Sequence, residues 1–312
     1  MGSQSPKKMK KKLALNICLI LIIMPVVLEL FVLGGILNQS PNTQIIEFFF
    51  GKDQTKEDFV EFLDVGQADC TVIRSDKKIA IIDFGVEQDG IKIQKRLLRM
   101  GVKEVELAII THHHSDHMGG FLKVTEKIKI KNLVINNSSA EDGEIELYNK
   151  IIQQAKNQKI NLILPKEGQS FKIGNANLSI LGCDRLAAEE NNRSVVSMLN
   201  ICNKKFLFTG DCDDNAELNL AQKYNLECDV LKMGHHGSKS SSNYLFLRLT
   251  EPEIAVASCG YDNLYNHPAT DALLRFEELG IKIYRTDLDK DVCFTFDSGK
   301  NNFQISKEGV AA

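Results

Sequence analysis

The chain has 312 residues, of which 43% are hydrophobic and 25% charged, so it can bury the core of one large domain or of two small ones. Five lysines between Lys7 and Lys12 give the first twelve residues a charge of +5, and since the whole chain carries −3, the remaining 300 residues carry −8. This acidic balance argues against a scaffold whose main task is to grip long polynucleotides, because such binding draws on clustered lysine and arginine.

The pattern of cysteines gives no support for two kinds of cysteine motif. Eight are present and none form a CxxC pair, so neither a zinc ribbon nor a thioredoxin-type motif is indicated. Several stand in apolar runs, among them Cys202 and Cys259, and we interpret these as buried thiols.

The first predicted element runs from Leu13 to Leu37 and contains one charged residue, Glu29. As a helix it would be about 37 Å long at roughly 1.5 Å per residue, enough to cross a bilayer core of about 30 Å. The lysines before it favour a cytoplasmic N-terminus, so we expect a single-pass anchor in the cell membrane with everything after residue 37 outside. A cleaved signal peptide is one alternative, although its apolar region is usually about 7–15 residues, and a buried core helix is another.

We expect four segments in all: a basic cytoplasmic segment at 1–12, a transmembrane helix at 13–37, a linker at 38–56 and a folded domain at 57–312. In the first half of that domain, short apolar runs predict strands at 59–65, 70–75, 78–84, 105–111, 132–137 and 160–165. Apolar residues at helical spacing predict helices at 91–100, with Gly101 as its cap, and at 144–158.

The second half repeats the alternation. Strands are predicted at 170–174, 177–182, 194–201, 205–211, 229–234, 254–259, 282–286, 292–296 and 303–307, and helices at 216–225, 244–250 and 272–280. The strands thus form two mixed groups, each followed by strand–helix alternation. That order predicts an α/β fold, a four-layer αβ/βα sandwich in which two sheets pack face to face and helices cover the outsides.

The strongest chemical signal is THHHSDHMGG, residues 111–120, which directly follows an apolar strand. In extended backbone, residues two apart point the same way, so His112 and His114 can face one cation. Asp116 and His117 follow in the turn and can face a second position. Imidazoles combined with a carboxylate suit zinc, and also manganese or iron.

Two later strands end in residues of the same kind. Asp211 closes KFLFTGD, and a carboxylate at such a sheet edge can bridge two cations. His235 and His236 follow the strand at 229–234, so six of the seven histidines lie at the ends of two apolar strands. The seventh, His267 in YNHPAT, is either part of the same site or an ordinary loop histidine.

These motifs resemble the metallo-β-lactamase superfamily, in which HxHxDH after a strand precedes a Gly-Asp and then a His-His-Gly-Ser. The opening FLDVGQADCTVIRSDKKIAIIDFG and the closing GHHGSKSS are similar to the extracellular hydrolase domain of the competence DNA-uptake channel family (the ComEC/Rec2 type) and its stand-alone relatives. The phosphorylcholine esterases of Gram-positive cell surfaces are similar too. The resemblance covers about residues 57–308 and implies that the metal ions lie at one edge between the two sheets.

The resemblance implies a ligand set of two metal ions, preferably zinc. His112 and His114 would bind the first metal, and Asp116 and His117 the second, with Asp211 as the bridge.

The remaining histidine pair and three carboxylates take supporting roles by the same resemblance. We favour His236 over His235 as a ligand to the second metal, with His235 as a contact to a substrate oxygen. Asp83 would support the ligand loop, while Asp64 and Asp69 of the DVGQAD motif would orient ligands and line the rim of the site.

The chain departs from the family pattern in two places. Many members place a further histidine before the bridging aspartate, whereas residues 191–197 here read NNRSVVS. The first metal would then have fewer protein ligands, and we expect Asn192 and Ser194 to contact substrate oxygens, which makes them catalytic candidates together with Asp116 and His235. The competence channel also has many membrane spans, so this chain, with one at most, is not expected to form a DNA channel alone.

The expected function is hydrolysis of phosphoester or phosphodiester bonds by a metal-activated water, on a small-molecule or polymer substrate, with DNA as a further candidate. One alternative is hydrolysis of another ester or amide, including a lactam. Another is a non-catalytic accessory protein of competence and DNA uptake. The complete HxHxDH, Asp211 and His236 set speaks against the non-catalytic alternative.

Overall fold

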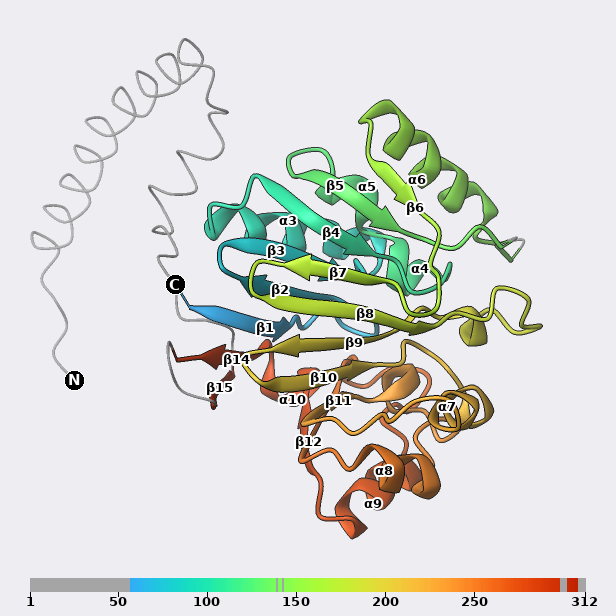
Figure 1. The fold of residues 1–312 in the computed structure, drawn as a ribbon. Helices are drawn as coiled ribbons and strands as arrows, with labels where there is room; N and C mark the ends of the chain where they lie inside the picture. Colours follow the sequence, from blue (N-terminus) through green and yellow to red (C-terminus); the bar gives the residue numbers. More distant parts are fainter. Residues whose placement is uncertain (1–56, 139, 142, 298–301, 308–312) are drawn as a thin grey trace, which may run out of the picture. The chain divides into compact units, whose positions relative to one another are not determined.

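The computed structural model describes residues 57–138, 140–141, 143–297 and 302–307 (Figure 1). The predicted basic segment, membrane helix and linker at 1–56 lie outside these residues. Within them, no helix combines the length and apolar character that a bilayer crossing requires. The membrane anchor therefore stays a prediction.

The first of two β-sheets joins the beginning and the end of the described chain. In this sheet β1 pairs antiparallel with both β2 and β14, and β3 to β6 run parallel to one another. The strand order is β15 (Phe303–Lys307), β14 (Val292–Phe296), β1 (Asp58–Phe62), β2 (Thr71–Ser75), β3 (Lys78–Ile82), β4 (Glu104–Ile109), β5 (Lys129–Val134) and β6 (Asn161–Ile163). The last two predicted strands thus leave the group next to them in sequence and complete the first sheet.

The second sheet is half parallel and half antiparallel. Its parallel half joins β10 to β13, and its antiparallel half is the meander from β7 to β10. The strand order is β13 (Lys282–Arg285), β12 (Ile254–Ala257), β11 (Val230–Lys232), β10 (Lys204–Phe208), β9 (Val196–Ile201), β8 (Ala176–Gly182) and β7 (Ser170–Ile173).

Apolar side chains from both sheets fill one core between them. Phe62 of β1 stacks on Phe208 of β10 with ring centroids 6.0 Å apart, and Phe206 meets Phe294 edge to face. All four rings are buried, and each buried ring contributes roughly 1.5–3 kcal/mol of hydrophobic stabilisation. The predicted face-to-face packing of two sheets is confirmed.

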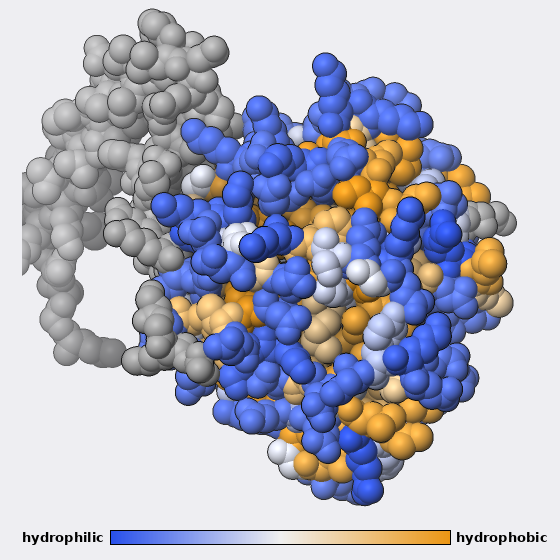
Figure 2. Space-filling model, viewed as in Figure 1, coloured by the Kyte–Doolittle hydropathy of each residue, from blue (hydrophilic) through white to orange (hydrophobic). Residues whose placement is uncertain are grey.

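Helices lie on both outer sides of the two sheets, as Figure 1 shows. Near β3 to β5 lie α3 (Gly90–Arg99), α5 (Phe121–Val124) and α6 (Ile145–Asn157), and near β10 to β12 lie α7 (Asp214–Ala221), α8 (Tyr244–Thr250) and α9 (Thr270–Glu278). A second apolar core, which includes Leu231, Phe246 and Phe276, joins β11 to α8 and α9. On the face shown in Figure 2, hydrophilic side chains predominate and hydrophobic ones lie between them.

Turn chemistry explains two of the strand connections. Asp76 and Lys77 both have positive φ, 43° and 65°, as the tight turn between β2 and β3 requires. Cys202 and Asn203 make the same kind of turn between β9 and β10. Cys202 is therefore exposed, which corrects its interpretation as a buried thiol, whereas Cys259 is buried as expected.

Candidate metal centre

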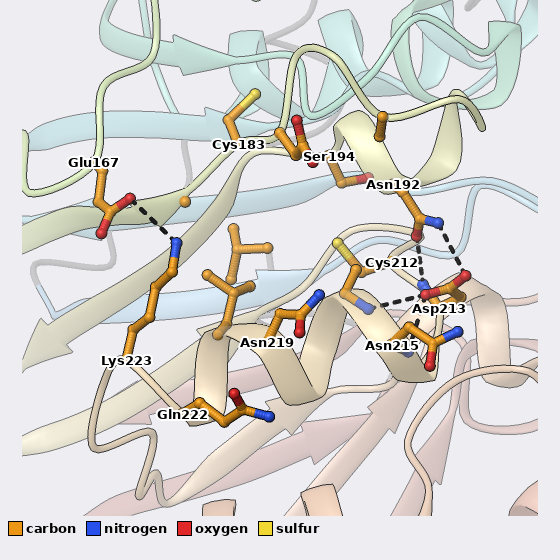
Figure 3. A pocket seen from close by; sticks show the side chains of 16 residues that line it. Glu167, Cys183, Asn192, Ser194, Cys212, Asp213, Asn215, Asn219, Gln222 and Lys223 are labelled. Atoms are coloured by element: carbon orange, nitrogen blue, oxygen red, sulfur yellow. Dashed lines mark hydrogen bonds and ion pairs between the residues drawn. The ribbon is translucent and has the colours of Figure 1, made fainter.

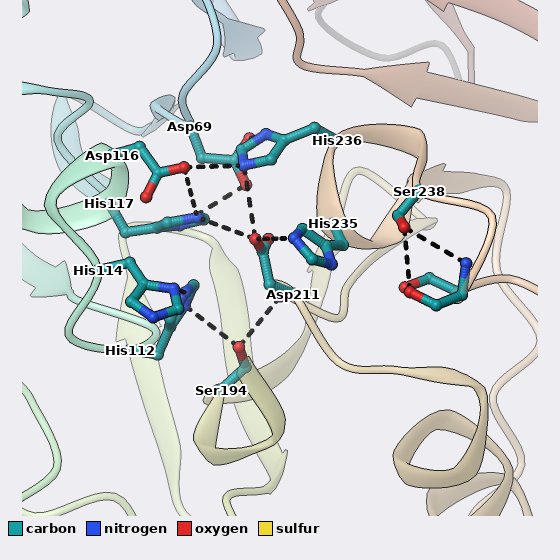
Figure 4. Close-up of polar contacts among 12 residues, drawn as sticks. Asp69, His112, His114, Asp116, His117, Ser194, Asp211, His235, His236 and Ser238 are labelled. Atoms are coloured by element: carbon teal, nitrogen blue, oxygen red, sulfur yellow. Dashed lines mark hydrogen bonds and ion pairs between the residues drawn. The ribbon is translucent and has the colours of Figure 1, made fainter. Parts of the chain in front are cut away.

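The candidate ligands follow the carboxyl ends of strands in both sheets. Residues 112–117 follow β4 of the first sheet. In the second sheet, Asp211 follows β10 and His236 follows β11. The short helix α4 (Ser115–Met118) begins directly after His114, whose backbone is still extended at φ −71° and ψ 146°. This local geometry lets His112 and His114 face each other, with 3.1 Å between His112 Nε2 and His114 Nδ1 (Figure 4).

Three buried histidines each have an acceptor at Nδ1. His117 Nδ1 lies 2.8 Å from Asp83 Oδ2, and His236 Nδ1 lies 2.9 Å from the carbonyl oxygen of Ser258. His112 Nδ1 lies 3.1 Å from Thr111 Oγ1. An acceptor at Nδ1 selects the tautomer that leaves the lone pair on Nε2, which is the form that ligates a metal.

The Nε2 atoms turn inward onto two carboxylates. His117 Nε2 is 3.3 Å from Asp211 Oδ2, and His236 Nε2 is 3.2 Å from Asp116 Oδ2 and 3.4 Å from Asp211 Oδ2. Among the described residues, three groups have ligand atoms within 4.8 Å of one another: His112, His117 and Asp211; Asp116, His117 and His236; and Asp69, Asp83 and His117. The second group is the set predicted for the second metal, and Asp211 of the first group also lies near His236 of the second.

Two buried polar atoms without a hydrogen-bond partner indicate that this arrangement fits a metal. Among the described side chains, His117 Nε2 and Asp211 Oδ1 have no hydrogen-bond partner although both are buried. A buried polar atom left unpaired costs about 1–3 kcal/mol, which a coordinated cation offsets. Imidazole nitrogens with carboxylate oxygens are a donor set for zinc, manganese or iron.

Electrostatics point to the same conclusion. Burial disfavours the charged form of His236, yet Asp211 and Asp69 outweigh it and raise the pKa of this imidazole to about 10. Burial likewise disfavours the Asp116 carboxylate, but His117 and His236 lower its pKa to about 2. Carboxylates and imidazoles in this site thus stabilise each other's charges, so a divalent cation bound here could take over the positive charge that a protonated imidazole supplies.

Asp83 and Asp69 support the imidazoles from behind. Asp83 accepts hydrogen bonds from the backbone N–H and the hydroxyl of Thr111, both at 2.8 Å, in addition to its contact with His117. Asp69 Oδ1 lies 3.4 Å from His236 Nδ1, and Asp69 Oδ2 lies 3.8 Å from His117 Nδ1. Both carboxylates thus contact candidate ligands on the side away from Nε2.

Asp64 belongs to a different group of residues. Its backbone N–H donates to Asp291 Oδ1 at 2.7 Å, its carbonyl oxygen accepts from Lys92, and its carboxylate pairs with Lys290 at 3.5 Å. These contacts fasten the chain after β1 to α3 and to the loop before β14, and the role of Asp64 at the rim of the site stays a prediction.

Ser194 links two of the candidate ligands. Its side chain is buried, its Oγ accepts the backbone N–H of Asp211 at 3.0 Å, and the same Oγ lies 3.3 Å from His112 Nδ1. Ser194 therefore connects His112 to Asp211 (Figure 4), and its contact with a substrate oxygen stays a prediction.

Asn192 is also occupied. Its amide nitrogen donates to Asp213 Oδ2 and its amide oxygen accepts the backbone N–H of Asp213, both at 2.9 Å. Asp213 is the N-cap of α7 and accepts from the backbone of Asn215 and Ala216. The amide of Asn192 therefore holds the start of a helix, and its contact with a substrate stays a prediction.

A pocket of about 670 Å³ lies beside these residues (Figure 3). Its walls come from α7 and from the chain between β8 and β9, and they carry amide side chains and the ion pair between Lys223 and Glu167. Asn192 and Ser194 line it, but none of the six candidate ligands does. The pocket is thus adjacent to the metal centre and separate from it.

His235 and His236 differ in depth. His236 is buried, whereas the side chain of His235 is 28% exposed and its Nε2 lies 3.6 Å from Asp211 Oδ2. Burial, with the neighbouring His236, lowers the pKa of His235. Of the two, His236 has the position of a ligand and His235 the position of a residue at the rim.

The sequence reasoning missed Lys232. This lysine of β11 is 3% exposed, and its Nζ lies 2.5 Å from Asp69 Oδ2. Burial opposes the charge, but Asp69 and Asp211 raise the pKa of Lys232. The available signal was a lysine inside an apolar strand, because such a lysine is almost never fully buried unless it is paired.

His113 was left without a role, and the structure shows why. Its ring is buried against Tyr148, and its Nε2 lies 3.2 Å from the carbonyl oxygen of Asn136. Its Nδ1 and its backbone N–H both face Glu190. His113 therefore braces the ligand loop from the side opposite to the centre.

Comparisons with known proteins agree with this geometry. The family model described as Metallo-beta-lactamase superfamily matches residues 63–261. The chain is 32% identical over 254 residues to the competence protein ComA of Neisseria gonorrhoeae, and 25% identical over 297 residues to ComE operon protein 3 of Bacillus subtilis. These alignments cover 80% and 89% of this chain but only 32% and 37% of the relatives, so the chain spans about a third of their length.

Two solved structures share the fold. CmlA, a diiron β-hydroxylase from Streptomyces venezuelae, has a TM-score of 0.54 and 14% identity over 78% of this chain and 55% of its own. Igni18, a metallo hydrolase from Ignicoccus hospitalis, has a TM-score of 0.50 and 16% identity over 77% of this chain and all of its own. The family model, which matches more than half of the chain, shows that the chain belongs to the metallo-β-lactamase superfamily.

Proposed function

We propose that this protein is a membrane-anchored metal-dependent hydrolase of phosphoester bonds, with phosphodiesters as the preferred class. One observation carries the proposal: the imidazoles of His112, His117 and His236 converge with two carboxylates in overlapping groups that share His117. Metal pairs of this kind serve the in-line displacement of phosphoryl oxygens. The resemblance to nuclease-like and phosphodiesterase-like branches of the family adds support by analogy.

The ligand assignment combines the contact between His112 and His114 with the second of these groups, and it gives His117, which also lies near Asp211, to the second metal. His112 and His114 with Asp211 would hold one divalent cation, and the group of Asp116, His117 and His236 would hold the other, with zinc preferred. Bound there, the two cations would activate a water and stabilise the negative charge that develops on the phosphoryl oxygens.

The protein's own groups supply orientation and contact. Asp83, the carbonyl oxygen of Ser258 and Thr111 keep each Nε2 aimed inward through their contacts with Nδ1. His235, half-buried at the rim, is the side chain proposed to contact a substrate oxygen. Asp116 has a side chain that is 29% exposed, so it lies at the open side of the centre, where a substrate enters.

The first cation position has room for a substrate oxygen. The segment at 191–197 contains no histidine, and Ser194 uses its hydroxyl to hold His112 and Asp211. A site with two imidazoles and one carboxylate leaves at least one coordination position open, as catalytic zinc sites do. This opening supports a hydrolase over a purely structural metal site.

Hydrolysis of bis-p-nitrophenyl phosphate tests the proposal. Activity should disappear with a chelator and return with zinc or manganese, and His114→Ala and Asp116→Ala should each lower it at least about a hundredfold, because they dismantle one assembled unit. Asp64→Asn is the matched control, since Asp64 lies in the same DVGQAD motif as Asp69 but pairs with Lys290 instead of the centre.

Two outcomes would contradict the proposed hydrolysis of phosphodiesters. Metal-loaded protein that hydrolyses nitrocefin and leaves phosphodiesters intact would move the proposal to lactams. Protein that binds metal and hydrolyses none of these substrates, yet binds DNA or a cell-wall polymer tightly, would support the accessory-protein alternative.

A further inference from the structure

A row of amide side chains lines the pocket beside the metal centre. Asn215, Asn219 and Gln222 follow one another at helical spacing, so they share one face of α7 and of the residue that caps its end (Figure 3). All three are exposed, and their side chains have no hydrogen-bond partner among the described residues. Each amide therefore has donors and an acceptor available for a ligand.

Other residues that line the same pocket are apolar. Val196 and Cys212 are buried, and Leu220 and Cys183 are half-buried. A pocket that combines C–H surface with a few polar groups suits a small molecule, because the apolar part binds and the polar part orients.

The charge of the pocket disfavours an anionic ligand. Among the described residues that line it, Glu167, Asp184 and Asp213 carry carboxylates and Lys223 carries the one cationic group. Lys223 lies 3.8 Å from Glu167, so its charge is already balanced. A phosphate or carboxylate ligand would meet more negative than positive charge here.

Cationic ligands and flat rings are disfavoured as well. The carboxylate of Asp213 accepts from the backbone of Asn215 and Ala216 and from the amide of Asn192, and no aromatic side chain lines the pocket within the described residues. A quaternary ammonium group or a nucleobase would thus find no ring to contact. A neutral ligand with several hydroxyl groups remains, because a hydroxyl donates and accepts as an amide does.

The pocket shares residues with the support of the metal centre. Ser194 lines it, and the Oγ of Ser194 lies 3.0 Å from the backbone nitrogen of Asp211 and 3.3 Å from His112 Nδ1. Asn192 lines it too and holds Asp213 at the start of α7. A ligand that joins α7 to the segment at 191–194 would therefore fix the groups that position two candidate ligands of the first metal.

We propose that this pocket binds a neutral sugar or polyol, and that the bound sugar tightens metal binding at the first position. The inference rests on the metal centre of the proposed function and adds a regulatory site to it. The volume of about 670 Å³ lies within the range of roughly 300–1,000 Å³ that is typical of small-molecule sites. Coupling is reciprocal, so bound metal should tighten the binding of the sugar by the same factor.

Calorimetric titration of the zinc-loaded full chain with maltose and with N,N′-diacetylchitobiose tests the site. At least one of these sugars should bind, and Asn215→Leu/Asn219→Leu should weaken it at least about tenfold through the loss of hydrogen bonds. Asn157→Leu, at an exposed asparagine of α6 outside the pocket, is the matched control and should bind as wild type does. Failure of both sugars to bind, or tighter binding of glucose 6-phosphate or choline, overturns the proposed ligand class.

Zinc titration of the metal-free chain with and without saturating sugar tests the coupling. The sugar should tighten zinc binding at one position about fivefold. Asn192→Leu, which releases Asp213 from the segment at 191–194, should reduce this effect to less than about twofold, whereas Asn157→Leu should retain it. Unchanged zinc affinity in the presence of bound sugar overturns the regulatory role. If the coupling is found and no phosphodiester is hydrolysed, the proposed function fails and the sugar site stands.

Discussion

At the scale of single residues, the partners of Nδ1 decide what each histidine can do. For His236 the acceptor is a backbone carbonyl oxygen, that of Ser258, which no side-chain substitution removes. For His117 it is the carboxylate of Asp83, and for His112 it is a hydroxyl. His117 and His112 therefore depend on side chains that can be changed, and substitutions there reach the metal without touching a ligand.

Ser194 is the first such residue, and we expect Ser194→Ala to weaken both the fold and the first metal position. The change leaves the backbone N–H of Asp211 buried without an acceptor, which costs about 1–3 kcal/mol, and removes one partner of His112 Nδ1. Urea denaturation and zinc titration calorimetry measure the two effects.

Ser197 provides a matched control on the same strand region. It is buried on β9, and its Oγ has no hydrogen-bond partner among the described residues, so Ser197→Ala should leave stability unchanged or slightly increased. If Ser194→Ala binds zinc as wild type does and only turnover falls, Ser194 contacts the substrate after all.

The buried pair of Lys232 and Asp69 yields a second prediction. Lys232→Met removes the cation that balances the Asp69 carboxylate, so it should lower the free energy of unfolding by about 3–5 kcal/mol. Lys232→Met/Asp69→Asn should recover part of that loss, because no charge is then left unpaired.

An exposed ion pair shows what burial adds. Lys78 pairs with Glu106 at 3.1 Å with 52% of the lysine side chain exposed, so Lys78→Met should cost less than about 1 kcal/mol. Denaturation curves of the three variants decide the matter. Equal losses in the free energy of unfolding for Lys78→Met and Lys232→Met would show that the buried pair stabilises the fold no more than the exposed pair does.

At the scale of elements, the turn after β11 holds two histidines in a strained backbone conformation. His235 and His236 both adopt left-handed backbone, with φ of 47° and 55°, within the short turn at Gly234–Gly237. Each such non-glycine residue costs on the order of 1 kcal/mol or more and persists only where the surroundings enforce it. Here the surroundings include Glu217 of α7, whose carboxylate accepts the backbone N–H of Ser242 at 2.6 Å.

Glu217 gives this element a predictable pH dependence. Burial raises its pKa from 4.5 to about 8, so the folded protein holds this proton more tightly than the unfolded chain does. Its contribution to stability is therefore fully present below about pH 4.5 and is lost as the pH rises through about 8. From this group alone the free energy of unfolding should fall by about 1.4 kcal/mol per pH unit across that window.

Substitution isolates this contribution. Glu217→Gln keeps the shape and an acceptor for Ser242, so its denaturation curves between about pH 5 and 8 should show a flatter dependence than those of wild type. Glu227→Gln, at an exposed glutamate, should reproduce the wild-type slope. Parallel slopes for all three proteins would refute the assignment.

At the scale of the whole molecule, the sequence places a basic and apolar segment before an acidic domain. The lysines at 7–12 and the apolar run at 13–37 predict that the full chain fractionates with membranes. Protease added to intact cells should then cleave the folded domain, and a chain that begins at residue 57 should stay soluble and folded. Recovery of all the full-length protein in the cytosolic fraction would contradict the anchor and the external location.

How much the sequence alone predicted depends on the distance between interacting residues. Most strands and helices were predicted near their observed bounds, because apolar periodicity is a local property. The two strands of the C-terminal hairpin were also predicted at their observed bounds, but their place in the first sheet was not, since β14 pairs with β1 through contacts between residues more than 200 positions apart, such as Phe59 with Thr295. The hairpin of β14 and β15 joins the first sheet at the edge of β1, and only the fold shows that, among the described residues, this edge has no other partner.

The candidate site likewise contains some residues that lie close together in the sequence and others that only the fold brings together. His112, His114, Asp116 and His117 lie on one short loop, so spacing alone determined that they face a common point. Asp211 and His236 were identified by their places at strand ends. Only the tertiary structure decided that Ser194 and Asn192 serve other protein groups, that Asp64 lies elsewhere and that Lys232 pairs with Asp69. The sequence cannot show whether a polar side chain near the site bonds to other protein groups, because its hydrogen-bond partners come from distant parts of the chain.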